Sequence, residues 1–154
     1  MIRLTNLADY AVVVMTAAAR APEARLSAAR VADVTSIPVP TVAKLMGTLA
    51  RGGLLVAARG VAGGFSLARP PCEISVAAIV EAVDGPIALT NCLSGENHDC
   101  AIEGHCTVRG HWGPINRAVR GALAAVTLAD LVRPYPPAAV SALAPAPVER
   151  EVVA

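Results

Sequence analysis

The sequence has few aromatic residues and no long uninterrupted apolar run. Tryptophan occurs once, tyrosine twice and phenylalanine once, so aromatics supply only 3% of a 154-residue chain that is 55% hydrophobic. Small aliphatic side chains must therefore build the core, which favours helices. Because no apolar run approaches the ~20 residues of a membrane span, we expect a cytoplasmic protein with no membrane partner.

Cysteine is also scarce, with four in the chain, three of them between residues 92 and 106. Four are too few and too clustered for the disulfide framework of a secreted domain. The N-terminus looks superficially like a signal peptide, but Asn6 and Asp9 interrupt its apolar run. Apolar residues recur there on one helical face: Leu7, Tyr10, Ala11, Val14, Met15 and Ala18. We therefore expect an amphipathic first helix in a reducing compartment.

Catalytic patterns are missing as well, since no nucleophile–base pair or phosphate-cradling loop occurs at interpretable spacing; we expect no enzyme. The net charge of +1 conceals an uneven distribution. Residues 1–70 carry a net charge of +5 and residues 71–112 a net charge of −5. This division indicates a basic half that meets a polyanion, joined to a region with another task.

The basic half has the pattern of a helix-turn-helix. Ser27 is a predicted N-cap for a short helix, and "SIPVP" ends that helix. Pro40 suits the first turn of a second helix, which Gly52 and Gly53 end. The apolar positions of the two helices are Ala28, Val31, Ala32 and Val34, then Val42, Leu45, Met46 and Leu49.

A glycine-rich turn between two short apolar stretches, "LLVAA" and "FSLA", predicts a β-hairpin directly after the second helix. Helix, turn, helix and hairpin in this order form a winged helix, which favours DNA binding. The alternatives are an ordinary solvated helix face and a plain solvent-exposed hairpin. The predicted DNA-contacting residues are Arg3, Ser27, Thr41, Lys44, Thr48, Arg51, Arg59, Gly60, Gly63 and Gly64.

The stretch "NCLSGENHDCAIEGHCTVRGHW" follows a further helix capped by Ser75 and ended by Gly85. Cys92, Cys100 and Cys106 lack the tight knuckle of structural zinc sites, and their wider spacing suits an iron–sulfur cluster. Bare thiol sensing and zinc binding remain open. A fourth ligand is missing; His98, His105 and His111 are local candidates, and a carboxylate from elsewhere is another. Cys72 stands apart and is interpreted as structural.

After Trp112, a helix is predicted to start with Pro114 in its first turn. Its apolar stripe is Ile115, Val119, Ala122, Leu123 and Val126. We expect this 114–127 helix to form a homodimer suited to a two-fold operator, with packing on its own domain as the alternative. The predicted organisation is a winged helix-turn-helix (1–85), a cysteine-rich loop (86–111), a dimerisation helix with a return segment (112–132) and a disordered Pro/Ala-rich tail (133–154).

Several segments together resemble the iron–sulfur cluster-binding winged-helix transcriptional regulators of the IscR and NsrR type. They are "RLTNLADYAVVVM", "RGVAGGFSLARP", "AIVEAVDGP" and the three-cysteine loop. "GPIALTNCLSG" and "CAIEGHCTVRGHWGPINRAV" are most similar to the subgroup that controls SUF iron–sulfur assembly operons. The resemblance covers about residues 1–133. It implies a mainly helical, homodimeric winged-helix regulator whose cluster, [2Fe–2S] or [4Fe–4S], alters DNA affinity.

The resemblance assigns Cys92, Cys100 and Cys106 as cluster ligands and Asp9 as a ligand from the partner subunit. The sequence departs from IscR in a longer first cysteine interval and in Arg109, which stands where IscR has its histidine ligand. Asp9 also suits the first helical turn, with Asn6 as N-cap. The leading hypothesis is a cluster-sensing repressor of iron–sulfur assembly genes. The alternatives are a winged-helix regulator sensing redox by thiols or zinc, and an iron–sulfur electron carrier.

Overall fold

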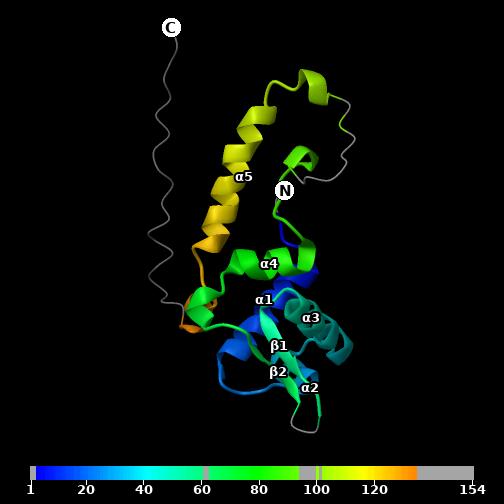
Figure 1. The fold of residues 1–154 in the computed structure, drawn as a ribbon, viewed down its shortest axis with the longest axis vertical. Helices are drawn as coiled ribbons and strands as arrows, with labels where there is room; N and C mark the ends of the chain where they lie inside the picture. The colour runs from blue at the N-terminus through cyan, green and yellow to red at the C-terminus, as the bar shows by residue number, and fades with distance from the viewer. Residues whose placement is uncertain (1–2, 61–62, 94–99, 101, 135–154) are drawn as a thin grey trace.

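The computed structural model describes residues 3–60, 63–93, 100 and 102–134. A helical unit with a two-stranded hairpin occupies one end of the molecule, and helix α5 rises away from it (Figure 1). This confirms the predicted mainly helical class with a hairpin wing. The tail predicted to be disordered lies outside the described residues from 135 onward. The elements in chain order are α1 (Asn6–Ala19), α2 (Ala28–Thr35), α3 (Val39–Arg51), β1 (Leu55–Ala58), β2 (Gly64–Leu67), η1 (Pro71–Glu73), α4 (Val76–Asp84), η2 (Asn91–Leu93), η3 (Glu103–His105), α5 (Arg109–Ala124) and α6 (Leu128–Val132).

Helix α1 forms the centre of the unit and packs against α2, α3, α4 and α6. Its N-cap is Thr5, whose side chain accepts from the backbone N–H of Ala8, so the predicted cap at Asn6 is wrong by one residue. Thr5 takes this role because its hydroxyl can also donate to Asp84 at 2.9 Å, which joins the start of α1 to the end of α4. Leu7 and Tyr10, expected in the core, stay 39% and 38% exposed.

The helix-turn-helix agrees with its predicted signals. Ser27 caps α2 by accepting from the N–H of Arg30, and the left-handed Ser36 (φ 59°) ends it. Pro40 lies in the first turn of α3, and Gly52 ends that helix. Val34, expected in the core of α2, is instead 58% exposed. The buried stripe of α3 is the predicted one: Val42, Leu45, Met46 and Leu49.

The wing is a two-stranded antiparallel sheet in which Leu55 pairs with Leu67 and Ala58 with Gly64. Leu26, ahead of α2, bonds to Phe65 of β2 through both backbone groups at 2.9 Å, which joins the wing to the helix-turn-helix. A Cβ atom at Gly63 would lie 2.6 Å from the carbonyl oxygen of Ala58, so only glycine fits this turn. The hairpin is therefore held at a fixed position beside α3.

The return segment completes the core of the winged-helix unit. Thr127 caps α6 with a capping box that includes Asp130, and the N–H of Leu128 donates to the carbonyl of Ile74 at 2.7 Å. The side chain of Leu128 is fully buried among residues of α1, α3 and α4. Cys72, interpreted as structural, is exposed on η1, a short turn that has no buried residue.

Helix α5 begins at Arg109, five residues before the predicted start at Pro114. Proline often marks the first turn of a helix, but here the residues before Pro114 already form a helical turn. The N–H of His111 donates to the carbonyl of Val108 in that turn. Proline at this place removes only one helical hydrogen bond. None of the α5 residues is fully buried in the single chain.

Candidate nucleic-acid interface and cysteine segment

The predicted recognition face of α3 is assembled in the structure. Lys44 and Arg51 are exposed, and Thr41 and Thr48 are partly buried beside them, on the side opposite the buried stripe. Arg51 donates to the Thr48 hydroxyl at 2.9 Å, which orients its guanidinium along the helix. A polar and cationic helix face of this kind can contact base edges and phosphates in a major groove.

The wing presents a second cationic position. Arg59 is exposed at the end of β1, and the next residue, Gly60, adopts a left-handed φ of 100° that non-glycine residues avoid. Gly64 lies against Leu26, where a Cβ atom would be 3.0 Å from a backbone oxygen. The predicted wing glycines therefore shape the turn, and Arg59 is the predicted wing residue that can reach a phosphate or a minor groove.

The remaining two predicted contacts lie in different places. Ser27 stands at the start of α2 and uses its hydroxyl as the helix cap. Arg3 lines a groove between the start of α1 and helix α5, together with Asp84 and Val119. The wing is at the other end of the unit (Figure 1). The structure therefore does not bring Arg3 to the surface that carries α3 and the wing.

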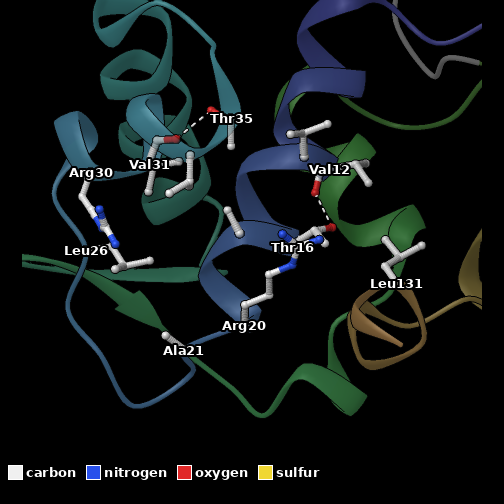
Figure 2. A pocket seen from close by; sticks show the side chains of 12 residues that line it. Val12, Thr16, Arg20, Ala21, Leu26, Arg30, Val31, Thr35 and Leu131 are labelled. Atoms are coloured by element: carbon white, nitrogen blue, oxygen red, sulfur yellow. Dashed lines mark hydrogen bonds between the residues drawn. The ribbon is translucent and has the colours of Figure 1, made fainter. Parts of the chain in front are cut away.

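A cavity of about 570 Å³ lies between α1 and α2, with Leu131 of α6 at one side (Figure 2). The hydroxyls of Thr16 and Thr35 donate to backbone carbonyls one turn earlier in their own helices, so the walls are largely apolar. Arg20 and Arg30 lie at opposite sides of this cavity. Sequence analysis did not single out these exposed cations, because neither belongs to the α3 face or the wing.

The cysteine segment leads from α4 to α5. Cys92 lies in η2, and Cys106 lies between η3 and α5. The thiols of Cys92, Cys100 and Cys106 are free and partly buried, and the Cys92 Sγ is 3.2 Å from the Thr90 hydroxyl. His98 lies outside the described residues; His105 and His111 are exposed. The segment therefore holds three accessible soft donors beside the start of α5.

The donors of this segment are thiols, the ligand type that iron–sulfur clusters and zinc ions share. Among the described residues, no three His, Cys, Asp or Glu side chains gather closely enough to hold one metal ion. The three partly buried thiols are of the chemical type that holds iron–sulfur clusters, and a fourth ligand would have to come from elsewhere. Asp9 is exposed on α1, and within the described chain its carboxylate has no hydrogen-bond or ion-pair partner.

Two residues of α5, Asn116 and Arg120, attach the cysteine segment and α4 to that helix, and sequence analysis missed both. Arg120 donates twice to Glu81 of α4, at 2.7 and 2.9 Å. These bonds, with the backbone N–H of Ile87, hold the pKa of Glu81 below its ordinary value. Asn116 bonds to the backbone at Ile87 and Leu89. A signal was present: polar residues recur one turn apart on the face of α5 that also carries Leu123.

Comparison with known proteins identifies the fold and its task. The profile of the Rrf2 family, described as iron-dependent transcriptional regulators, matches residues 4–134. The chain belongs to the Rrf2 family. It is therefore a helix-turn-helix transcriptional regulator and not an enzyme. Among its relatives, the IscR regulator of Serratia proteamaculans is 30% identical to this chain, over 84% of this chain and 79% of the relative.

Other Rrf2 relatives and neighbours extend the comparison. The NsrR regulator of Shouchella clausii is 28% identical over 84% of this chain and 88% of its own length. The structure of CymR, the global cysteine regulator of B. subtilis, is similar with a TM-score of 0.66 and 26% identity, over 86% of this chain and 97% of CymR. T. potens IscR has the same fold, with a TM-score of 0.63 and 23% identity over 85% and 86% of the two chains. Among the described helices, none has the length and apolar character of a membrane span.

Proposed function

We propose that this protein is a homodimeric repressor that senses iron–sulfur cluster status, redox state or nitric oxide, and controls genes of iron–sulfur cluster assembly. The observation that carries the proposal is the set of three partly buried free thiols on one segment beside α5. That segment is joined to a complete winged-helix unit. Similarity to IscR and NsrR regulators supports the same assignment.

In the proposed complex with operator DNA, α3 enters the major groove with Thr41, Lys44, Thr48 and Arg51. The exposure and common face of these residues support this arrangement. Arg59, with Gly60, Gly63 and Gly64, places the wing against the backbone or minor groove. Ser27 at the N-terminus of α2 adds a phosphate contact, since helix N-termini favour anions. Arg3 stays a predicted DNA contact, although it lines the groove between the start of α1 and α5.

A homodimer through the 114–127 helix is part of the proposal. Ile115 is 45% exposed on α5, and a groove between α5 and the start of α1 is lined by Leu4, Leu89, Val119 and Ala122. An apolar face beside a groove is suited to a second copy of the same helix. Two recognition helices in one dimer match a two-fold operator.

The proposed ligands are Cys92, Cys100 and Cys106, with Asp9 of the partner subunit as the fourth. When bound, the cluster supplies a group that reacts with oxidants and nitric oxide. Asp9 lies on α1, which packs against both helices of the helix-turn-helix. Ligation by Asp9 would therefore tie the DNA-binding unit of one subunit to the cysteine segment of the other, and its release would free the recognition helices to move.

The proposal is tested by anaerobic purification, followed by a visible absorption spectrum and analysis of iron, sulfide and zinc. Near-equal iron and sulfide in a brown protein supports it. The loaded and cluster-free forms are then compared for binding to one operator at one salt concentration. A colourless protein with zinc or with nothing bound contradicts the cluster and leaves the winged-helix regulator.

A regulator that senses redox through bare thiols is the second candidate. Two observations favour it: the three cysteines are free thiols in the described chain, and the oxidised form of Staphylococcus aureus CymR has the same fold, with a TM-score of 0.65. This candidate predicts no iron after anaerobic purification. It also predicts that mild oxidation changes operator affinity and that a thiol reductant reverses the change.

Replacing Arg59 by alanine is expected to weaken operator binding and to lower the salt slope of the binding constant by about one unit, because one phosphate or groove contact is lost. Arg59 is exposed, so the fold should be unchanged. Fluorescence anisotropy on an operator duplex at several salt concentrations measures the slope. An unchanged slope removes Arg59 from the interface.

A further inference from the structure

The chain between α4 and Cys92 has little structure of its own. Gly85, with a left-handed φ of 84°, ends α4, and residues 85–90 form neither helix nor strand. Their backbone groups need partners from elsewhere. Asn116 of α5 supplies two: its Nδ2 donates to the carbonyl of Ile87 at 2.8 Å, and its Oδ1 accepts from the N–H of Leu89 at 3.0 Å.

A side-chain amide is suited to this place because it offers one donor and one acceptor in a fixed plane. The Asn116 amide bonds to Ile87 and Leu89, which are two positions apart, in the way that the backbone of a neighbouring β-strand would. The amide is also held in position, since Arg120, one turn along α5, donates to Glu81 of α4. Leu123, a further turn along, packs in the cluster formed by Ala8, Val76 and Val80. Asn116 therefore reaches the segment from a helix that is fixed to the winged-helix unit.

The fixed backbone leads directly to the first cysteine. Leu89 precedes Thr90, whose carbonyl accepts from the N–H of Leu93 at 3.0 Å and so closes the η2 turn around Cys92. The Thr90 hydroxyl is also 3.2 Å from the Cys92 Sγ. The amide of Asn116 thus sets the position of residue 89, and the turn that starts at residue 90 sets the thiol.

We propose that Asn116 is a positioning residue that holds Cys92 against α5, and that it couples the state of the cysteine segment to the helix assigned to the dimer. The part that concerns the cluster rests on the proposed function. The amide connects two elements with different tasks: the segment that carries the first thiol, and the helix that orients one subunit against the other. Without it, Ile87 and Leu89 lose the two hydrogen bonds that join them to the side chain of Asn116.

The first experiment uses the cluster-free protein and measures alkylation of individual cysteines by iodoacetamide, with mass spectrometry of the peptides. Cys72 is exposed and distant in sequence, so it serves as an internal reference. Asn116→Ala is expected to raise the alkylation rate of Cys92 relative to that of Cys72 by about tenfold. In the wild type the segment must break its two hydrogen bonds to Asn116 before it can open and expose Cys92, whereas in the variant these bonds are absent. An unchanged Cys92 rate relative to Cys72 would overturn the proposal.

Two further variants separate hydrogen bonding from packing. Asn116→Asp keeps the size of the side chain but turns an oxygen toward the Ile87 carbonyl, so it is expected to match the alanine variant. Arg117→Ala changes an exposed neighbour on the same helix and is expected to leave the Cys92 rate within about twofold of the wild type. A slow, wild-type rate in Asn116→Asp would show that only the volume of the side chain matters and would overturn the proposal.

The second experiment uses the loaded protein. Asn116→Ala is expected to shift the visible spectrum, to shorten the half-life of the cluster in air by about tenfold, and to bring the operator affinities of loaded and cluster-free forms closer together. Arg117→Ala should do none of these. An unchanged spectrum, half-life and affinity ratio would overturn the coupling. If the wild type carries no iron, the proposed function fails, but the alkylation experiment still decides the role of Asn116.

Discussion

Cys92→Ala is expected to remove the visible absorption of the anaerobically purified protein and to lower its iron content by at least about tenfold, because second-shell changes alone already cost ten- to a hundredfold in metal affinity. Cys92 is one of only three cysteines in the segment, and Leu89, three residues before it, is hydrogen-bonded to Asn116 of α5. Its side chain is partly exposed, so the alanine variant should keep the fold of the winged-helix unit.

Cys72→Ala is the matched control. It also removes a free thiol, but Cys72 is exposed on η1, in a different part of the fold. Colour and iron content should be those of the wild type. Absorption and iron analysis on both variants, with circular dichroism for the fold, check the prediction. If Cys72→Ala bleaches the protein and Cys92→Ala does not, the ligand assignment is wrong. Retained iron in both variants contradicts it as well.

Operator binding by the Cys92→Ala variant gives the direction of regulation. If loss of the cluster weakens binding at constant salt, the loaded form is the repressor. If it strengthens binding, the cluster-free form is. In the described part of the chain, η2 contacts α5, α5 packs on α4, and α4 packs on α1 and α3, so a change at Cys92 can reach the winged-helix unit along this path. The exposed Asp9 on α1 and the amide of Asn116 on α5 are the two connections proposed for this purpose.

The sequence was most informative where local chemistry decides the structure. The cap at Ser27, the glycines that end α3 and the hairpin around Gly63 all follow from backbone preferences that a few neighbouring residues set. The buried stripe of α3 follows from period alone. Each of these predictions depends on residues close together in the chain, and the structure confirms them.

The sequence was least informative where distant residues decide the structure. Thr5 replaces Asn6 as the cap of α1 because its hydroxyl also reaches Asp84, far along the chain. The role of Asn116 was missed, since its partner, the carbonyl of Ile87, lies 29 residues earlier in the chain. The position of the cysteine segment also depends on long-range packing, since Asn116 bonds to the backbone at Ile87 and Leu89.

The apolar stripe predicted for the helix after Trp112 divides into two faces in the structure. Leu123 turns toward α4, where it packs with Val76 and Val80. Ile115 and Ala122 remain exposed on a different side. Packing on the own domain is therefore confirmed for one face of this helix, and packing on a partner stays a prediction for the other face. The exposed face is the one on which the proposed dimer depends.

Ala122→Glu is expected to convert the dimer to monomers at micromolar concentration and to weaken operator binding by about 100-fold or more. In a two-fold interface the substitution occurs twice, and each carboxylate would be buried without a partner against an apolar face. Ala122 lines the groove between α5 and the start of α1, but it is exposed in the single chain. The variant should therefore fold as well as the wild type and fail only in association.

Ala124→Glu tests whether the effect depends on the face or on the charge. Residue 124 is exposed on the same helix, two positions along, and points to the opposite side of α5. Both variants place a carboxylate near the C-terminus of the helix, so their cost to helix stability is similar. Sedimentation of both should show monomers for Ala122→Glu and dimers for Ala124→Glu. Dimers in both variants would exclude this face from the interface. Monomers in both would mean that the partner covers more of α5 than its apolar side, because a carboxylate at position 124 interferes only where the second subunit also packs.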